Sequence, residues 1–199
     1  TIISQVEVDP EDPAFYHPTK PIGRFMTREE AIKKEAKGIP CVEDSGRGYR
    51  QVVASPKPKR IRELQTIRTL VNAGHIVVTC GGGGIPVVQK DGKLVGVNAV
   101  IDKDSASSLL AQKLDAEYLV ILTAVEKVAI HFGKPDQQWL SELTVEEAKK
   151  YMAEGEFPAG SMLPKIEAAI AYLEKVPAGK VLITSMDHVK DAIRGKAGT

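Results

Sequence analysis

Four consecutive glycines follow a short apolar run in the first half of the sequence. Residues 76–80 read Ile-Val-Val-Thr-Cys, and Gly81, Gly82, Gly83 and Gly84 come next. Because glycine has no Cβ atom, its backbone N–H groups can approach a phosphate closely. The spacing matches neither a Walker loop nor the G-x-G-x-x-G pattern of dinucleotide-binding proteins. A glycine run also forms flexible turns, but its place after a predicted strand favours phosphate binding.

A second segment places a lysine between two acids. Asp102, Lys103 and Asp104 precede an expected helix over 104–114. Asp102 suits a helix N-cap, which is a purely structural role. The same arrangement can fix the Lys103 ammonium where a phosphoryl group passes.

A third segment, Pro158–Lys165, places a lysine at an expected helix start. Ser161 is a plausible N-cap, and Pro164 suits the first turn. Lys165 then lies in that turn, where the helix dipole disfavours a cation. This local conflict suggests that an anion binds between the lysine and the helix end.

A fourth lysine, Lys20, lies between Pro18 and Pro21. On its own it resembles an ordinary surface lysine, although the prolines could present it inward. Lysines and backbone amides together meet the needs of phosphoryl transfer, in which catalysis is mainly positioning and electrostatic stabilisation. The four histidines show no metal-ligand spacing, so we predict no metal-binding residues.

Composition narrows the class of protein. The chain has 199 residues, a net charge of +1 and a pI near 7.7, which gives no reason to expect nucleic acid as a partner. The longest apolar run, around residues 118–122, is far too short to cross a membrane. Cys41 and Cys80 are too far apart for a metal or redox motif, so we expect free thiols in a cytoplasmic protein.

Apolar β-branched strands alternate with amphipathic helices along most of the chain. The expected strands are 1–8, 52–53, 76–80, 118–123 and 181–184, with a hairpin around Asp91-Gly92, and the expected helices are 27–36, 61–73, 104–114, 144–152, 162–175 and 187–194. We expect the strands at 76–80 and 118–123 to be buried. This order predicts an α/β fold with a mainly parallel sheet. Ligands of such sheets bind beyond the carboxyl ends of the strands, here after Cys80, Thr123 and Thr184.

Residues 9–58 differ from the rest, because they hold seven of the twelve prolines. We interpret 9–58 as a small lid subdomain, and 1–8 with 59–199 as the main α/β domain.

Several motifs together resemble the carbamate kinases of the amino acid kinase superfamily. They occur in the order Pro18-Thr-Lys-Pro-Ile-Gly23, Ser55-Pro-Lys-Pro58, Gly81-Gly-Gly-Gly-Ile-Pro-Val-Val88, Ala99-Val-Ile-Asp-Lys-Asp104, Phe132-Gly-Lys-Pro135 and Gly160-Ser-Met-Leu-Pro-Lys-Ile-Glu-Ala-Ala169. The resemblance covers essentially the whole chain. It implies a three-layer α/β/α sandwich with a protruding lid, assembled as a homodimer.

The resemblance also implies reversible transfer of a phosphoryl group between ATP and carbamate with Mg²⁺, giving ADP and carbamoyl phosphate. In cells the reverse direction would make ATP during arginine breakdown. By the same resemblance, Lys103 and Lys165 contact the transferring group, Asp104 orients both lysines, and Lys20 belongs to the lid that closes over the site. The implied nucleotide-binding residues are Ala124, Val125, Glu126, Val128 and Met162.

One departure from the family concerns its opening strand and Gly-Gly-Asn loop, which nothing in this sequence matches. We therefore expect further residues before Thr1, or a fragment that binds nucleotide without turnover. Another amino acid kinase, acting on a carboxylate or on UMP, is the nearest alternative, since the glycine loop and Asp104 are shared features. The segment around Lys20 favours carbamate kinase.

Overall fold

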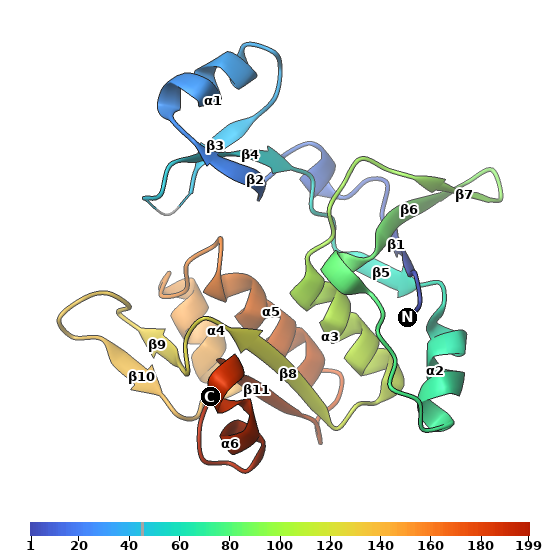
Figure 1. Cartoon of the computed structure of the whole chain (residues 1–199), viewed down its shortest axis with the longest axis vertical. Coiled ribbons are helices and arrows are strands. Elements are labelled where there is room, and N and C mark those ends of the chain that lie inside the picture. Colours follow the sequence, from blue (N-terminus) through green and yellow to red (C-terminus); the bar gives the residue numbers. More distant parts are fainter. Residues whose placement is uncertain (45) are drawn as a thin grey trace. The chain divides into compact units, whose positions relative to one another are not determined.

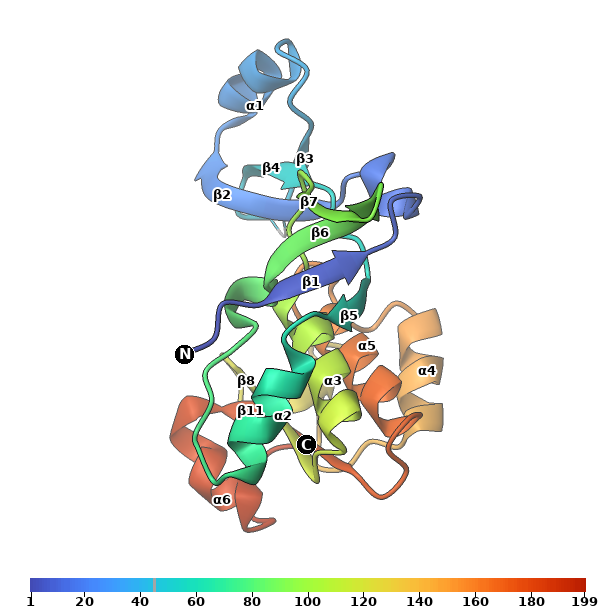
Figure 2. The same cartoon turned by 90° about the vertical axis from the view of Figure 1, so that its right-hand side faces the viewer.

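The computed structural model describes residues 1–44 and 46–199 and contains two structural units, residues 1–109 and residues 110–199 (Figure 1). In the first unit, β1 (Gln5–Val8) is the second strand of a sheet with the order β5-β1-β6-β7. It pairs in parallel with β6 (Ile85–Lys90) and antiparallel with β5 (Pro58–Ile61). Figure 2 shows β1 lying between these two strands. The first unit is thus organised by a strand from the start of the chain.

A tight turn and two helices complete this part of the unit. Strand β6 returns as β7 (Lys93–Gly96) through the predicted Asp91-Gly92 hairpin, in which both residues have positive φ. Helix α2 (Leu64–Asn72) follows β5 and buries Ile67. Helix α3 (Lys103–Leu114) agrees with the predicted helix over 104–114.

A second, smaller sheet lies within residues 9–58. Its antiparallel strands are β2 (Lys20–Met26), β4 (Tyr49–Val53) and β3 (Cys41–Glu43), in that order. Helix α1 (Arg28–Glu35) covers it, as Figure 1 shows, and a short 3₁₀ turn (Pro13–Phe15) precedes it. A capping box starts α1, in agreement with the helix predicted over 27–36, because Thr27 and Glu30 each accept the other's backbone N–H. The separate lid subdomain remains a prediction.

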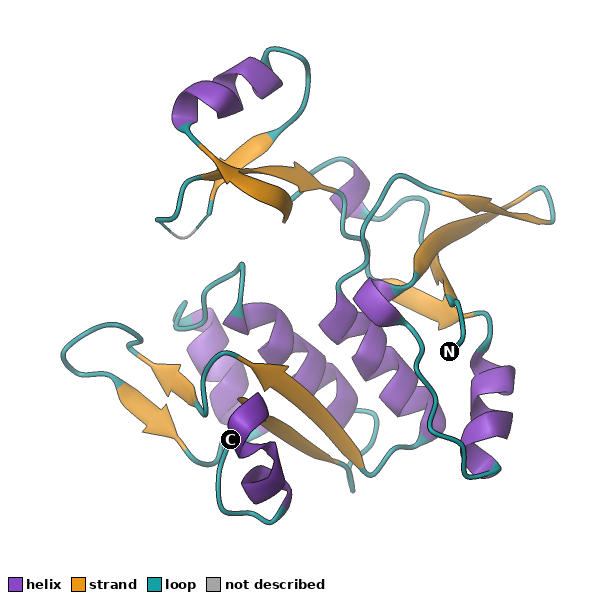
Figure 3. Ribbon diagram, viewed as in Figure 1, coloured by secondary structure: helices purple, strands orange, loops and turns teal. Residues whose placement is uncertain are grey.

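The second unit places helices on both sides of a parallel strand pair, β8 (Tyr118–Thr123) and β11 (Lys180–Ser185) (Figure 3). Helices α4 (Val145–Ala153) and α5 (Met162–Leu173) lie on one side, while α6 (Val189–Ile193) and the 3₁₀ turn Met186–His188 lie on the other. A short hairpin, β9 (Val128–Ile130) with β10 (Gln138–Leu140), completes the unit.

The core of the second unit lies between the strand pair and α4–α5. Its fully or nearly fully buried side chains come from every one of these elements: Leu119, Ile121, Val128, Ala148, Phe157, Ile166, Ala168, Ile170, Tyr172 and Ile183. This layering confirms the α/β class that the alternating sequence pattern predicted.

Some expectations about individual elements were wrong. Residues 76–80 do not form a strand in the described structure: Val78 accepts a hydrogen bond from the Ile2 N–H, but Ile76 is almost wholly exposed. Apolar, β-branched composition cannot by itself supply the ladder of paired backbone groups that defines a strand. Ile61 belongs to β5 instead of the following helix, because it pairs with Val6 of β1. This pairing outweighs its helical spacing to Leu64.

The sheet also differs in detail from the expectation. Within the described residues, the parallel pairs β1–β6 and β8–β11 belong to separate sheets. Strand β8 is buried on one face only, since Leu119 and Ile121 point into the core while Val120 and Leu122 are exposed. No helix of the described chain is long and apolar enough to cross a membrane.

Tyr172 offers a test of the core of the second unit. Its side chain is fully buried, and its hydroxyl donates a hydrogen bond to the Ala116 carbonyl. Burial, followed by the nearby Glu117 charge, raises the pKa of Tyr172 above its usual value, so the neutral donor is retained. Tyr172→Phe should destabilise the chain by about 1–2 kcal/mol, because a buried carbonyl loses its partner. Urea denaturation measures this change.

The matched control for this prediction is Tyr118→Phe, because the Tyr118 side chain is partly exposed on β8. That variant should change the free energy of unfolding by less than about 0.5 kcal/mol, as is usual for surface substitutions. Equal effects of the two substitutions would contradict the role given to the Tyr172 hydroxyl.

Candidate active site

The four glycines form a tight turn whose two ends are hydrogen-bonded to one residue of a neighbouring segment. Ser4 accepts the Cys80 N–H through its side-chain oxygen (3.3 Å) and the Ile85 N–H through its carbonyl (2.8 Å). Between these ends, Gly82, Gly83 and Gly84 have positive φ, and Cys80 does too. Within the turn, the Gly83 N–H donates to the Cys80 carbonyl (2.9 Å). Binding of phosphate by this turn remains a prediction.

Gly83 brings this turn against the segment that precedes the Asp-Lys-Asp motif. A Cβ atom at position 83 would lie only 2.1 Å from the Ile101 carbonyl oxygen, and Ile101 itself is buried. Only glycine permits this approach of two backbones. The glycine turn and the motif, which are separate in the sequence, are therefore neighbours in the structure.

The Asp-Lys-Asp motif forms the start of α3. Asp102 caps the helix, since its Oδ1 accepts the N–H groups of Asp104 (2.8 Å) and Ser105 (3.2 Å). Lys103 is largely exposed, whereas Asp104 is buried. Their side chains approach to 3.5 Å between Nζ and Oδ2, and the orientation of Lys103 by Asp104 remains a prediction.

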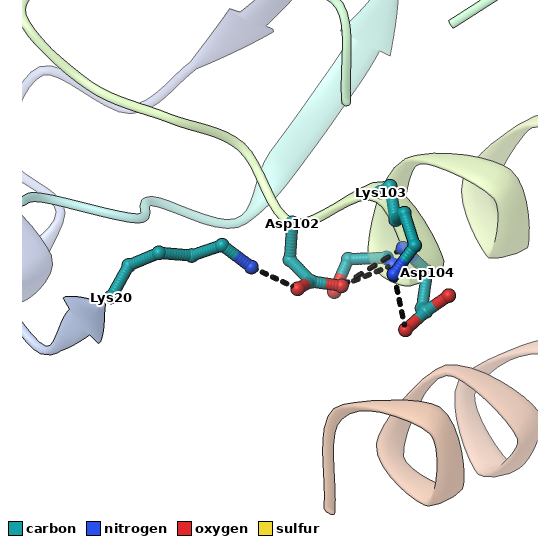
Figure 4. A network of polar contacts seen from close by, with 5 residues as sticks. Lys20, Asp102, Lys103 and Asp104 are labelled. Atoms are coloured by element: carbon teal, nitrogen blue, oxygen red, sulfur yellow. Dashed lines mark hydrogen bonds and ion pairs between the residues drawn. The ribbon is translucent and has the colours of Figure 1, made fainter. Parts of the chain in front are cut away.

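Lys20 joins the same group from strand β2. Its ammonium forms an ion pair with the Oδ2 atom of Asp102 (Figure 4). Burial acts to raise the pKa of Asp102, but the Lys20 hydrogen bond and charge and the Ser105 and Asp104 N–H groups outweigh it. The pKa of this carboxyl therefore lies below its usual value, and the carboxylate is charged near neutral pH.

Lys165 lies in the first turn of α5, as predicted, and is buried despite its charge. Pro164 precedes it in that turn. The prediction for Ser161 was wrong in one respect: its side chain makes no capping hydrogen bond in the described structure. The Pro158 carbonyl instead accepts the N–H groups of Ser161 and Leu163, which removes the need for a side-chain cap.

The predicted nucleotide segment follows the carboxyl end of β8. Ala124 and Glu126 are exposed, and Val125 is half-buried. Val128 differs from them: its side chain is fully buried in the core, and its N–H donates to Thr199 Oγ1 (2.9 Å). Met162, at the start of α5, is half-buried and packs against the same core.

A polar contact that the sequence analysis missed joins the loops after β8 and β11. The His188 Nδ1 atom shares a hydrogen bond with Ser185 Oγ (2.8 Å), and the Nε2 atom of the same ring lies 3.7 Å from Glu126 Oε2. Both loops follow carboxyl ends of parallel strands, where ligands of α/β sheets bind. That rule predicted chemistry in the loop after Thr184, but the sequence analysis did not single out His188 within this loop.

The described residues thus offer two groups of candidate functional side chains. The first unit combines a glycine turn with Lys20, Lys103 and the helix start that Asp102 already caps. Because Asp102 occupies the first N–H groups of α3, an incoming phosphoryl group would be met by lysines and glycine amides. The second unit contributes Lys165 and the loop 124–127. Among the described residues, no cluster of three or more His, Cys, Asp or Glu side chains could hold a metal ion.

Comparison with known proteins identifies the family. The model of the amino acid kinase family matches residues 26–185, and the chain belongs to that family.

Within this family the chain is similar to carbamate kinases. It is 53% identical to the carbamate kinase-like protein YqeA of Escherichia coli and 54% identical to a carbamate kinase of Staphylococcus haemolyticus. Each match covers the whole chain but only 64% and 65% of the relative, so the chain spans about two thirds of the length of these proteins.

Solved structures of carbamate kinases are also similar to this chain. Carbamate kinase of Giardia lamblia bound to citric acid matches with a TM-score of 0.92 at 42% identity, over all of this chain and 62% of that one. The same enzyme bound to AMP-PNP matches with a TM-score of 0.85 at 44% identity, over all of this chain and 63% of that one.

The close approach at Gly83 predicts a strong effect of a single methyl group. Gly83→Ala should destabilise the chain by at least about 2 kcal/mol, because the new Cβ meets a backbone oxygen and a positive φ. Thermal or urea unfolding of the variant measures the loss.

Gly81→Ala is the control within the same turn. An added Cβ there meets nothing within 4 Å, and its φ is not in the left-handed region. The expected loss of stability is below about 1 kcal/mol. If Gly81→Ala were as destabilising as Gly83→Ala, contact with Ile101 would not be what requires glycine.

Proposed function

We propose that this chain is the greater part of a carbamate kinase, which transfers a phosphoryl group reversibly between ATP and carbamate. The observation that carries the proposal is the convergence of the glycine turn, Lys103 and Lys20 at the start of α3. Such a set of cations and backbone amides stabilises the charge of a transferring phosphoryl group. The choice of carbamate rests on the carbamate kinases to which the whole chain is similar.

In the direction that makes ATP, a β-phosphate oxygen of ADP attacks the phosphorus of carbamoyl phosphate. The bond from phosphorus to the carbamate oxygen breaks, and carbamate leaves with that electron pair. Lys103 and Lys165 would contact the phosphoryl oxygens, with Asp104 orienting them. Lys20 would approach from the lid segment, residues 9–58.

The nucleotide would contact the loop after β8, through Ala124, Val125, Glu126 and Val128, and Met162 at the start of α5. Val128 is the least available of these residues, because its side chain is buried and its N–H is donated to Thr199 Oγ1. Mg²⁺ commonly binds phosphate oxygens of a nucleotide while keeping several waters, and we assign it no protein ligand here. The metal would neutralise charge on the phosphates.

The same proposal includes a homodimer that works in the cytoplasm and makes ATP from carbamoyl phosphate in arginine breakdown. The two cysteines, which are free thiols in the structure, suit a reducing compartment.

The test is a coupled assay of ATP formation from ADP, Mg²⁺ and carbamoyl phosphate, with the intact mass of the protein recorded. Lys165→Ala should lower kcat at least about a hundredfold, the usual effect of removing one group that stabilises transition-state charge. Lys175→Ala is the matched control, because Lys175 is exposed just beyond the other end of α5. It should leave kcat unchanged.

The outcomes separate the alternatives. Binding of ADP without turnover in the 199-residue chain would assign it as a nucleotide-binding part and transfer the activity to the longer protein. A longer chain that binds ADP but uses another acyl phosphate would overturn the carbamate assignment. Equal losses in Lys165→Ala and Lys175→Ala would overturn the role of Lys165.

A further inference from the structure

Asp102 uses its two carboxylate oxygens for different partners. Oδ1 accepts the Asp104 and Ser105 N–H groups at the start of α3, and Oδ2 holds the Lys20 ammonium. Figure 4 shows the Lys20 side chain extending toward this oxygen, with Lys103 and Asp104 on the far side of Asp102. One carboxylate therefore joins strand β2 to the helix start, across 82 positions of the sequence.

This ion pair is more protected from water than the Lys59–Asp9 pair at the surface. The side chains of Lys20 and Asp102 are 27% and 16% exposed, against 60% and 37% for Lys59 and Asp9. Pairs in partly buried surroundings are screened less by solvent and salt. Removing the carboxylate would therefore leave the Lys20 ammonium without a fixed counter-charge.

The geometry leaves Lys20 able to act on a second anion. An ammonium carries three N–H donors, and its bond to Asp102 uses one of them. A lysine side chain is long and flexible, so fixing its end before substrate arrives reduces the entropy lost in the transition state. The anchor is itself fixed, since two backbone N–H groups of α3 hold its other oxygen.

We propose that Asp102 is a positioning residue, which holds the Lys20 ammonium at the start of α3 for contact with the transferring phosphoryl group. This role rests on the proposed function, but the ion pair can be tested without it. Asp102 does not itself contact the reacting atoms. It acts through Lys20, and this separates the proposal from a simple capping role.

Asp102→Asn is the informative substitution. Asparagine caps helices as well as aspartate does, so the start of α3 and the melting temperature should be preserved. The neutral amide loses the charge that attracts Lys20. Asp9→Asn is the matched control, because Asp9 likewise holds a lysine, Lys59, with one oxygen and accepts a backbone N–H, from Glu11, with the other.

The first experiment measures the reactivity of individual lysines in the 199-residue chain by reductive methylation and mass spectrometry. An ammonium that is held in an ion pair is less available to a reagent than one that moves freely in solvent. Asp102→Asn should accelerate methylation of Lys20 at least about threefold and leave Lys59 unchanged, whereas Asp9→Asn should leave Lys20 unchanged. Unchanged reactivity of Lys20 in Asp102→Asn would overturn the proposal, whether or not the chain is an active kinase.

The second experiment is a double-mutant cycle in the kinase assay, on the active form of the protein. Asp102→Asn should lower kcat at least about tenfold when Lys20 is present, and less than twofold in a Lys20→Ala background. Equal losses in both backgrounds would show that Asp102 does not act through Lys20. An unchanged or increased kcat in the single variant would also overturn the role, leaving Asp102 as a helix cap only.

If neither the parent chain nor its full-length form makes ATP, the proposed function fails while the methylation result still decides the ion pair. If the parent is active but Asp102→Asn behaves like the parent in both experiments, the positioning role fails and the proposed function stands.

Discussion

The close approach of the Gly83 backbone to the Ile101 carbonyl is the constraint on which the rest of the first unit's site depends. It joins a turn after residue 80 to a helix that starts at residue 103. The start of α3 then determines where Asp102, Lys103 and Asp104 lie, and Asp102 in turn fixes Lys20. A methyl group at position 83 would therefore disturb lysines that it does not touch.

The sequence was sufficient to predict features that depend on local chemistry. The capping box of α1, the Asp91-Gly92 hairpin and the helices that carry Lys103 and Lys165 have signals within a few residues. It failed where pairing partners are distant. Residues 76–80 have strand composition but no ladder in the described structure, and Ile61 pairs with β1 despite its helical spacing to Leu64.

In the candidate site, too, local features could be predicted from the sequence and long-range contacts could not. The glycine run and the two lysine-bearing helix starts could be recognised one by one, because each breaks a local rule of composition or charge. The ion pair between Lys20 and Asp102 could not, since nothing near either residue specifies the other. Likewise, Ser161 was expected to cap α5, but the Pro158 carbonyl already satisfies those N–H groups.

The hydrogen bonds of Ser4 affect the order in which this region folds. Its hydroxyl and carbonyl fasten the two ends of the glycine turn, at Cys80 and Ile85, and it precedes β1, which pairs with β6. The turn can acquire its final shape only after a loop of more than seventy residues has closed, and closure of long loops is entropically costly. The glycine turn is therefore a late product of folding, formed once the strand order of the first unit is established.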